Sequence, residues 1–296
     1  MFLIALSVEV LFRQNALMNS DSPQIALDIA NPARARRIRV GVGGWTYEPW
    51  RSNFYPPGLP QHQELAFASR HLTAIEVNGT YYSTFKPATF AKWRDETPDD
   101  FVFSLKANRF ATHRKVLATA SESITRFIGS GISELGPKLG PIVWQFMPTK
   151  VFEAEDFEAF LALLPRSVNG VALRHVLDVR HESFMTLEYL ALARRYHCVT
   201  VYTDAEKFPA IADAEGDFAY LRLMRSEADC ATGYAPEALD AWAAGAKAWA
   251  SGPRAREVFV YFINGAKERA PAAAMALLAR LAHPGDGCTE RMTPTI

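Results

Sequence analysis

Acidic, basic and amide side chains recur where short apolar runs of this sequence end. Glu76 and Asn78 are two residues apart, as are Asp178 and Arg180. Because side chains alternate along a β-strand, the members of each pair face the same side. Such groups are costly to remove from water unless they pair or bind a ligand, so the pattern favours a ligand site. The full set of three acids, three bases and three amides is Glu76, Asn78, Lys106, Gln145, Asp178, Arg180, Asp204, Arg222 and Asn264.

Acid–base catalysis on a small anionic substrate is the chemistry that this set suggests. Glu76 or Asp204 would act as general acid or base, because a carboxyl group in a desolvated pocket beside a cation can be tuned toward neutral pH. Lys106 and Arg180 would hold an anionic group of the substrate. His181 is a further catalytic candidate, with a weaker claim because it faces away from Arg180 if the strand continues through it.

Aromatic and histidine side chains in the loops are further candidates for binding the substrate. Trp45 and Tyr47 belong to an aromatic cluster in the first loop, which would either wall the pocket or form that loop's own small core. His113 lies in a polar loop and would either reach over the pocket or be solvated. Buried ion pairs can also be purely structural, and this alternative stays open for each charged residue.

Two alternative functions would use the same residues. A metal-dependent hydrolase or isomerase would take Glu76, Asp178, His181 and Asp204 as ligands of Mn²⁺, Mg²⁺ or Zn²⁺. No local ligand motif supports this site and the nearby basic residues would repel a cation, so we predict no cofactor. The other alternative is a non-catalytic protein that binds a small anion, because a fold does not define a function.

Composition indicates a soluble globular protein and argues against two classes of partner. The chain has 296 residues, of which 32 are basic and 32 acidic. A zero net charge lacks the basic excess expected of a nucleic-acid-binding protein. The apolar stretch 2–12 is about half of the roughly 20 residues that a membrane-spanning helix needs. Cys198, Cys230 and Cys288 form no disulfide or zinc motif, which fits a cytoplasmic location. The oligomeric state is left open.

Eight β-branched and aromatic runs alternate with helical stretches along the chain. Their starts are about 31 residues apart, close to one strand, loop and helix. Eight such repeats predict an α/β fold, a (β/α)8 TIM-type barrel, with ligands at the carboxyl ends of its strands. Only 13 residues, 205–217, follow the sixth run, so the sixth helix should be short or missing. The predicted strands are 38–45, 74–82, 101–107, 141–146, 175–180, 198–204, 218–224 and 257–264.

This repeat pattern also divides the chain. We expect one barrel domain over residues 38–282, an N-terminal extension over 1–37 and a C-terminal tail over 283–296. Met18 is an alternative start, in which case the first 17 residues are not part of the native protein.

Several motifs follow one another in an order typical of one family. They are 43–50 (GGWTYEPW), 75–82 (IEVNGTYY), 101–106 (FVFSLK), 140–141 (GP) with 145–146 (QF), and 178–184 (DVRHESF). Together they resemble the DUF72 family of YecE-like proteins over about residues 38–282. The resemblance implies a TIM-type barrel and a family without an assigned activity.

The resemblance weakens after the last two strands. Met224-Arg225 stand where the family usually has His-Gly, and Asn264 is followed by Gly265 in place of a second Asn. If the family's ligand is held partly by the eighth loop, this member would bind it differently or not at all.

Overall fold

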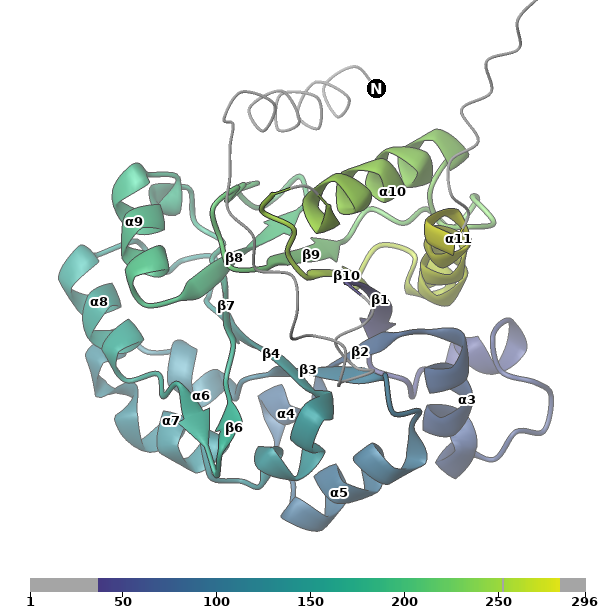
Figure 1. Cartoon of the computed structure of the whole chain (residues 1–296), viewed down its shortest axis with the longest axis horizontal. Coiled ribbons are helices and arrows are strands. Elements are labelled where there is room, and N and C mark those ends of the chain that lie inside the picture. Colours follow the sequence, from purple (N-terminus) through teal and green to yellow (C-terminus); the bar gives the residue numbers. More distant parts are fainter. Residues whose placement is uncertain (1–36, 252, 283–296) are drawn as a thin grey trace, which may run out of the picture.

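Eight parallel strands close into a barrel in the computed structural model, which describes residues 37–251 and 253–282 (Figure 1). The order around the ring is β1-β10-β9-β8-β7-β4-β3-β2, and pairing of β1 with β10 closes it. The predicted TIM-type barrel is therefore confirmed. The strands are β1 (Ile38–Gly43), β2 (Ala74–Val77), β3 (Val102–Lys106), β4 (Leu139–Gln145), β7 (His175–Asp178), β8 (Cys198–Thr203), β9 (Ala219–Leu223) and β10 (Val258–Phe262).

Helices surround the ring of strands (Figure 1). They bury apolar stripes against it, as Ile124, Phe127 and Ile128 do on α7. The longer helices are α3 (Glu64–His71), α5 (Pro87–Glu96), α7 (Ser121–Ile128), α8 (Ala154–Ala162), α9 (Leu187–Arg195), α10 (Pro236–Ala250) and α11 (Ala270–Ala282). Between β8 and β9, residues 204–218 form turns and no helix, which confirms the missing sixth helix. None of the helices described is long and apolar enough to cross a membrane.

Short elements complete the loops. The 3-10 helices are η1 (Glu48–Ser52), η2 (Gln61–Gln63), η3 (Leu117–Ala120), η4 (Ile132–Lys138), η5 (Glu182–Phe184) and η6 (Lys267–Arg269). The one-turn helices α4 (Gly79–Tyr82) and α6 (Arg109–Thr112) follow β2 and β3, and β5 (Ser167–Val168) pairs with β6 (Val171–Ala172). All of the extension except Arg37, the alternative start at Met18 and the whole tail 283–296 lie outside the described residues.

Most strands end earlier than predicted. The run 74–82 is a strand only to Val77, because Asn78 takes helical angles (φ −83°, ψ −21°) and the chain turns into α4. The run 175–180 likewise ends at Asp178. These apolar runs continue past the ladder because the first residues after each strand still pack over the end of the barrel. Asn78, Arg180, Asp204 and Asn264 therefore lie in the loops directly after strands, whereas the other polar residues of the predicted set remain within strands.

One glycine is required for the ring to close tightly. A Cβ atom at Gly41 of β1 would lie 1.9 Å from the carbonyl oxygen of Ala74 on β2. Any side chain there would push these two paired strands apart. This contact explains why the first run carries glycine inside the strand.

A buried histidine anchors the outer face of the barrel. Trp144 Nε1 on β4 donates to His175 Nδ1 at 3.1 Å, and His175 Nε2 lies 2.8 Å from the Pro165 carbonyl oxygen. A carbonyl only accepts, so Nε2 carries the proton and the ring is neutral. Burial lowers the pKa of His175 to about 4.

This histidine should make stability depend on acid. As pH falls below about 6.5 the unfolded chain protonates His175, whereas the folded chain resists protonation until about pH 4. The free energy of unfolding should therefore decrease by about 2–3 kcal/mol between pH 7 and pH 4.5 from this group alone. His175→Gln should remove that part of the pH dependence, measured by urea unfolding at both pH values. An unchanged pH dependence in the variant would contradict this role.

Candidate functional site

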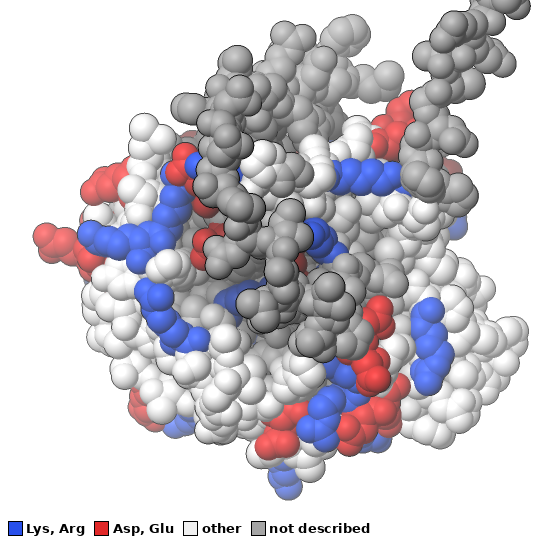
Figure 2. Space-filling view, in the orientation of Figure 1, with Lys and Arg blue, Asp and Glu red and all other residues white. Residues whose placement is uncertain are grey.

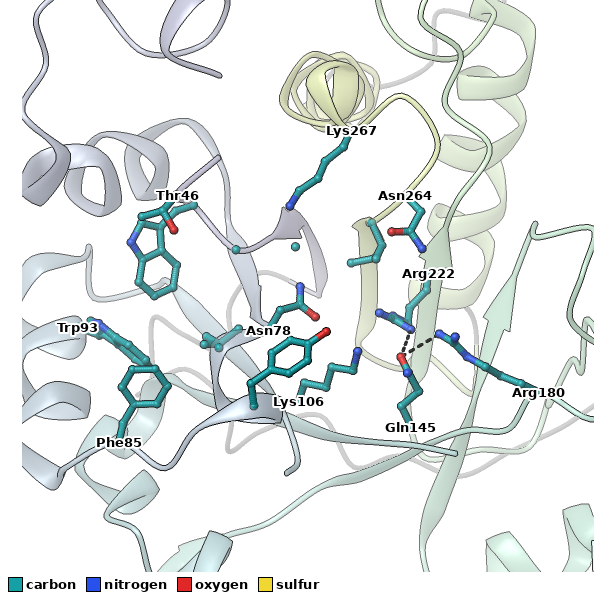
Figure 3. A pocket seen from close by; sticks show the side chains of 17 residues that line it. Thr46, Asn78, Phe85, Trp93, Lys106, Gln145, Arg180, Arg222, Asn264 and Lys267 are labelled. Carbon is teal, nitrogen blue, oxygen red and sulfur yellow. Dashed lines mark hydrogen bonds between the residues drawn. The ribbon is translucent and has the colours of Figure 1, made fainter. Parts of the chain in front are cut away.

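A cavity of about 590 Å³ opens at the carboxyl ends of the strands (Figure 3). Strand ends and the loops after them supply its walls, as expected for a TIM-type barrel. Among the described residues, all charged side chains that line it are basic. The lining residues are Gly43, Gly44, Trp45, Thr46, Val77, Asn78, Gly79, Tyr82, Phe85, Trp93, Lys106, Gln145, Arg180, Arg222, Ile263, Asn264 and Lys267.

A buried guanidinium group forms the floor of this cavity. Arg222 on β9 donates from Nη2 to Glu76 Oε1 on β2 at 3.0 Å, and from Nη1 to Asp178 Oδ2 on β7 at 2.5 Å. Tyr220 Oη also donates to Glu76, at 2.9 Å from Oε2. Arg222 is 1% exposed and Glu76 is completely buried, so these charges are retained because they are paired. The two carboxylates hold the pKa of Arg222 above its ordinary value against the opposing effect of burial.

The network continues upward into the cavity through Arg180. Its Nη2 donates to Asp178 Oδ2 at 3.0 Å and to Gln145 Oε1 at 2.8 Å. Arg222 Nη1 lies 3.4 Å from the same oxygen of Gln145, and Figure 3 shows both contacts. Gln145 therefore fixes the spacing of two guanidinium groups at the cavity wall.

Lys106, the last residue of β3, lines the cavity and forms no ion pair with an acidic residue of the described chain. It is 7% exposed, and its Nζ lies 4.0 Å from the centre of the Tyr81 ring. No residue in the described ranges accepts a hydrogen bond from this Nζ. Burial, followed by the nearby charge of Arg222, lowers the pKa of Lys106 to about 8. The ammonium group is therefore available to a ligand.

Lys267 adds a second cation from the opposite side (Figure 3), and it was not among the site residues predicted from the sequence. Trp50 Nε1 donates to the Lys267 carbonyl oxygen at 2.9 Å, and the Tyr47 ring centre lies 4.4 Å from Nζ. Burial lowers the pKa of Lys267. The position of Lys267, three residues after Asn264, could have identified it as a cavity residue. The aromatic residues Tyr82, Phe85 and Trp93, which follow β2 and also line the cavity, could have been found in the same way.

Of the predicted site residues, seven lie on the lining: Trp45, Asn78, Lys106, Gln145, Arg180, Arg222 and Asn264. Glu76 and Asp178 lie beneath it as partners of Arg222. Tyr47 packs on Trp50 with ring centres 5.6 Å apart, and it touches the cavity only through Lys267. Trp45 thus lines the cavity, whereas Tyr47 packs on Trp50 and against the main hydrophobic core of the protein.

The other three predicted residues lie outside the lining. Asp204 accepts from the Met224 amide at 2.6 Å and from Tyr234 Oη at 2.7 Å, and burial raises its pKa. His181 Nδ1 lies 2.9 Å from Ser183 Oγ and caps η5. His113 Nε2 lies 2.6 Å from Tyr81 Oη, and its pKa is lowered by burial and by Arg109. Each has a local partner that accounts for its position.

The ligand set of the alternative metal site does not come together. Glu76 and Asp178 both bind Arg222, whereas His181 and Asp204 bind other partners. Within residues 37–251 and 253–282, no group of three or more His, Cys, Asp or Glu side chains could hold a metal ion. These four residues thus do not form one ligand set in the described part of the chain.

Comparisons with known proteins agree with this architecture. The UPF0759 protein YecE of Escherichia coli K12 is 31% identical over 142 residues, 47% of this chain and 48% of that protein. The alignment thus spans about half the length of this curated relative. The crystal structure of a DUF72 family protein from Thermotoga maritima superposes with a TM-score of 0.68 at 23% identity, covering 84% of this chain and 100% of that one.

A second DUF72 structure, from Enterococcus faecalis, gives a TM-score of 0.64 at 16% identity over 84% of this chain and 97% of that one. At these identities the two structures support the fold alone. The sequence model of the family described as "Protein of unknown function DUF72" matches residues 39–295. This confirms the resemblance found in the motifs, and the chain belongs to the DUF72 family.

Proposed function

We propose that this protein binds a small molecule with an anionic group, a carboxylate or a phosphate, in the cavity at the carboxyl end of the barrel. The observation that carries the proposal is the charge of the cavity. Lys106, Arg180, Arg222 and Lys267 line it, and no carboxylate of the described chain does. Two acids beneath the floor offset two of these four cations, which leaves an excess of positive charge facing the cavity.

The size and lining of the cavity support a small ligand with an apolar part. About 590 Å³ falls within the range typical of small-molecule sites. Trp93 and Phe85 lie on one side of the cavity and Gln145, Arg180 and Arg222 on the other (Figure 3). A ligand that places its anionic group near the guanidinium groups would rest its remaining atoms on the aromatic side.

The surface pattern favours a small ligand over a nucleic acid. On the face shown in Figure 2, basic and acidic side chains are interspersed around the molecule. With 32 residues of each sign in the chain, the basic excess that phosphate backbones require is lacking. The positive charge that supports our proposal is local to the cavity.

Direct acid–base catalysis by Glu76 or Asp204 is not favoured by their positions. A general acid or base must reach the proton that it transfers. Glu76 is buried against Arg222 below the floor, and Asp204 bonds to Met224 and Tyr234 outside the lining. We therefore propose that Glu76 maintains the charge arrangement of the floor. A non-catalytic binding protein would use the same cavity, and turnover of a bound ligand distinguishes the two.

Anionic ligands should stabilise the protein and require Arg180. A thermal-shift screen would compare carboxylates and phosphate esters with their neutral amide and alcohol analogues. A ligand at about 100 times its Kd adds about 2.7 kcal/mol of stability, which should raise Tm by about 5 °C or more. Arg180→Gln should weaken binding by about tenfold or more, because it removes a charge-assisted hydrogen bond.

The matched control is Arg126→Gln. Arg126 is 70% exposed, pairs with Glu122 on the surface of α7 and lies outside this cavity. The affinity of the Arg126→Gln variant for the same ligands should equal that of the unmodified protein. Neutral analogues that raise Tm as much as the anions, or an Arg180→Gln variant with full affinity, would contradict the proposal.

Removal of the Glu76 charge should destabilise the whole barrel. Glu76→Gln keeps the size of the side chain but leaves Arg222 with one carboxylate, and breaking a buried ion pair costs about 3–5 kcal/mol. Glu122→Gln, in the exposed pair with Arg126, should cost less than about 1 kcal/mol. Urea unfolding measures both. Equal stability of the two variants would show that Glu76 does not support the floor.

A further inference from the structure

We propose that Lys106 is the reactive group of this cavity and that its side-chain amine forms an imine with a substrate aldehyde or ketone. The inference rests on the proposed function, because the neighbouring cations would hold the anionic group of the same substrate. The substrate class is therefore a small molecule that carries both a carbonyl group and a carboxylate or phosphate.

The partners of Lys106 differ from those of the other buried lysine. Lys138 is 5% exposed, and its Nζ donates to the carbonyl oxygens of Arg94 at 2.6 Å and Thr97 at 2.7 Å. It is a satisfied structural lysine. Lys106 is 7% exposed and lines the cavity. Its Nζ contacts the face of the Tyr81 ring, whereas the Nζ of Lys138 contacts carbonyl oxygens. A buried amine that has no acceptor among the described residues and lines a cavity is placed to react with a molecule that enters it.

The Tyr81 ring, which lies next to the amine of Lys106, is held in place by two hydrogen-bond partners of its hydroxyl group. Gln145 Nε2 donates to Tyr81 Oη at 3.4 Å, and Tyr81 Oη lies 2.6 Å from His113 Nε2. Because the pKa of His113 is lowered, its neutral ring can accept a hydrogen bond from the Tyr81 hydroxyl group. The Tyr81 ring therefore has a fixed position 4.0 Å from Nζ, which restricts where the lysine side chain can lie. An oriented nucleophile is the result.

The surroundings of Lys106 also favour its neutral, nucleophilic form. Arg222 and Arg180 oppose a further positive charge, whereas Glu76 and Asp178 favour it, and burial is the largest effect. With a pKa of about 8, about a tenth of the amine is neutral at pH 7. An unperturbed lysine, with a pKa of about 10.4, is less than about one part in a thousand neutral. Desolvation and a neighbouring cation are known means of activating an amine for this chemistry.

The reaction needs no oxidant and no second substrate. The lone pair of neutral Nζ attacks the carbonyl carbon, so a C–N bond forms and the C=O π-electrons move to oxygen. One proton passes from nitrogen to that oxygen, which gives a neutral carbinolamine. The C–O bond then breaks, and the oxygen leaves as water with the second nitrogen proton. The product is a C=N bond between the substrate and Lys106.

Reductive trapping on the full chain tests this step. The protein is incubated with glyoxylate and cyanoborohydride, and modified lysines are located by peptide mass spectrometry. Carboxymethyllysine should form at Lys106 at least about tenfold faster than at Lys92, a side chain that is 62% exposed. The rate at Lys106 should rise as pH increases through about 8 and then level off. Lys106→Gln, checked for folding by circular dichroism, should lose this adduct alone.

Modification of Lys106 no faster than Lys92 would overturn the proposal. A parallel reaction with acetaldehyde, a carbonyl compound without a charge, separates it from the anion-binding function. If acetaldehyde and glyoxylate show the same preference for Lys106, the imine stands and anion binding fails. If inorganic phosphate raises the Tm of the protein but not that of Arg180→Gln, and neither aldehyde modifies Lys106 preferentially, the anion-binding proposal is supported and the imine proposal is refuted.

Discussion

The ion pairs of Arg222 with Glu76 and Asp178 are the interaction on which the rest of the site depends. They join β9 to β2 and β7 through the inside of the barrel. A guanidinium group removed from water is tolerated only when carboxylates and hydrogen bonds compensate for its lost hydration. Glu76 and Asp178 both pair with Arg222, and neither lines the cavity. Any chemistry in the cavity must therefore come from the side chains that line it.

The pairing of these two acids with Arg222 explains why all charged side chains on the described lining are basic. Asp178 also binds Arg180, so one acid is shared by two guanidinium groups and neither acid lines the cavity. Lys106 and Lys267 then add positive charge without adding a carboxylate. The same cations that would attract an anion also oppose a proton on Lys106. The proposed anion binding and the proposed nucleophilic amine would thus share one arrangement of charges.

Much of the fold could be predicted because its signal is local and repeated. Eight apolar runs at regular spacing predict the barrel, and the short Pro-containing segment after the sixth run predicts the missing helix. The position of polar residues at the strand ends also predicted where the cavity lies. The ends of the strands were predicted less accurately, because buried apolar residues such as Tyr81 and Val179 continue the runs after the strands have ended at Val77 and Asp178.

The roles of individual residues could not be predicted in the same way. Glu76 and Arg222 are 146 residues apart, and only closure of the ring decides that they pair with each other. Asp204 and His181 are also catalytic candidates in the sequence, but each binds a nearby partner, Tyr234 and Ser183 respectively. Lys267 reaches the cavity because Trp50 of the first loop holds its carbonyl oxygen, a contact over 217 residues.

The most direct test of the central claim is to locate a bound oxyanion. Crystals grown without sulfate or phosphate would be soaked in selenate, and anomalous diffraction would be measured at the selenium edge. We predict a peak in the cavity within hydrogen-bonding distance of Arg180 or Lys106, and its loss in Arg180→Gln crystals. Selenate peaks confined to the outer surface, with an empty cavity, would contradict the account.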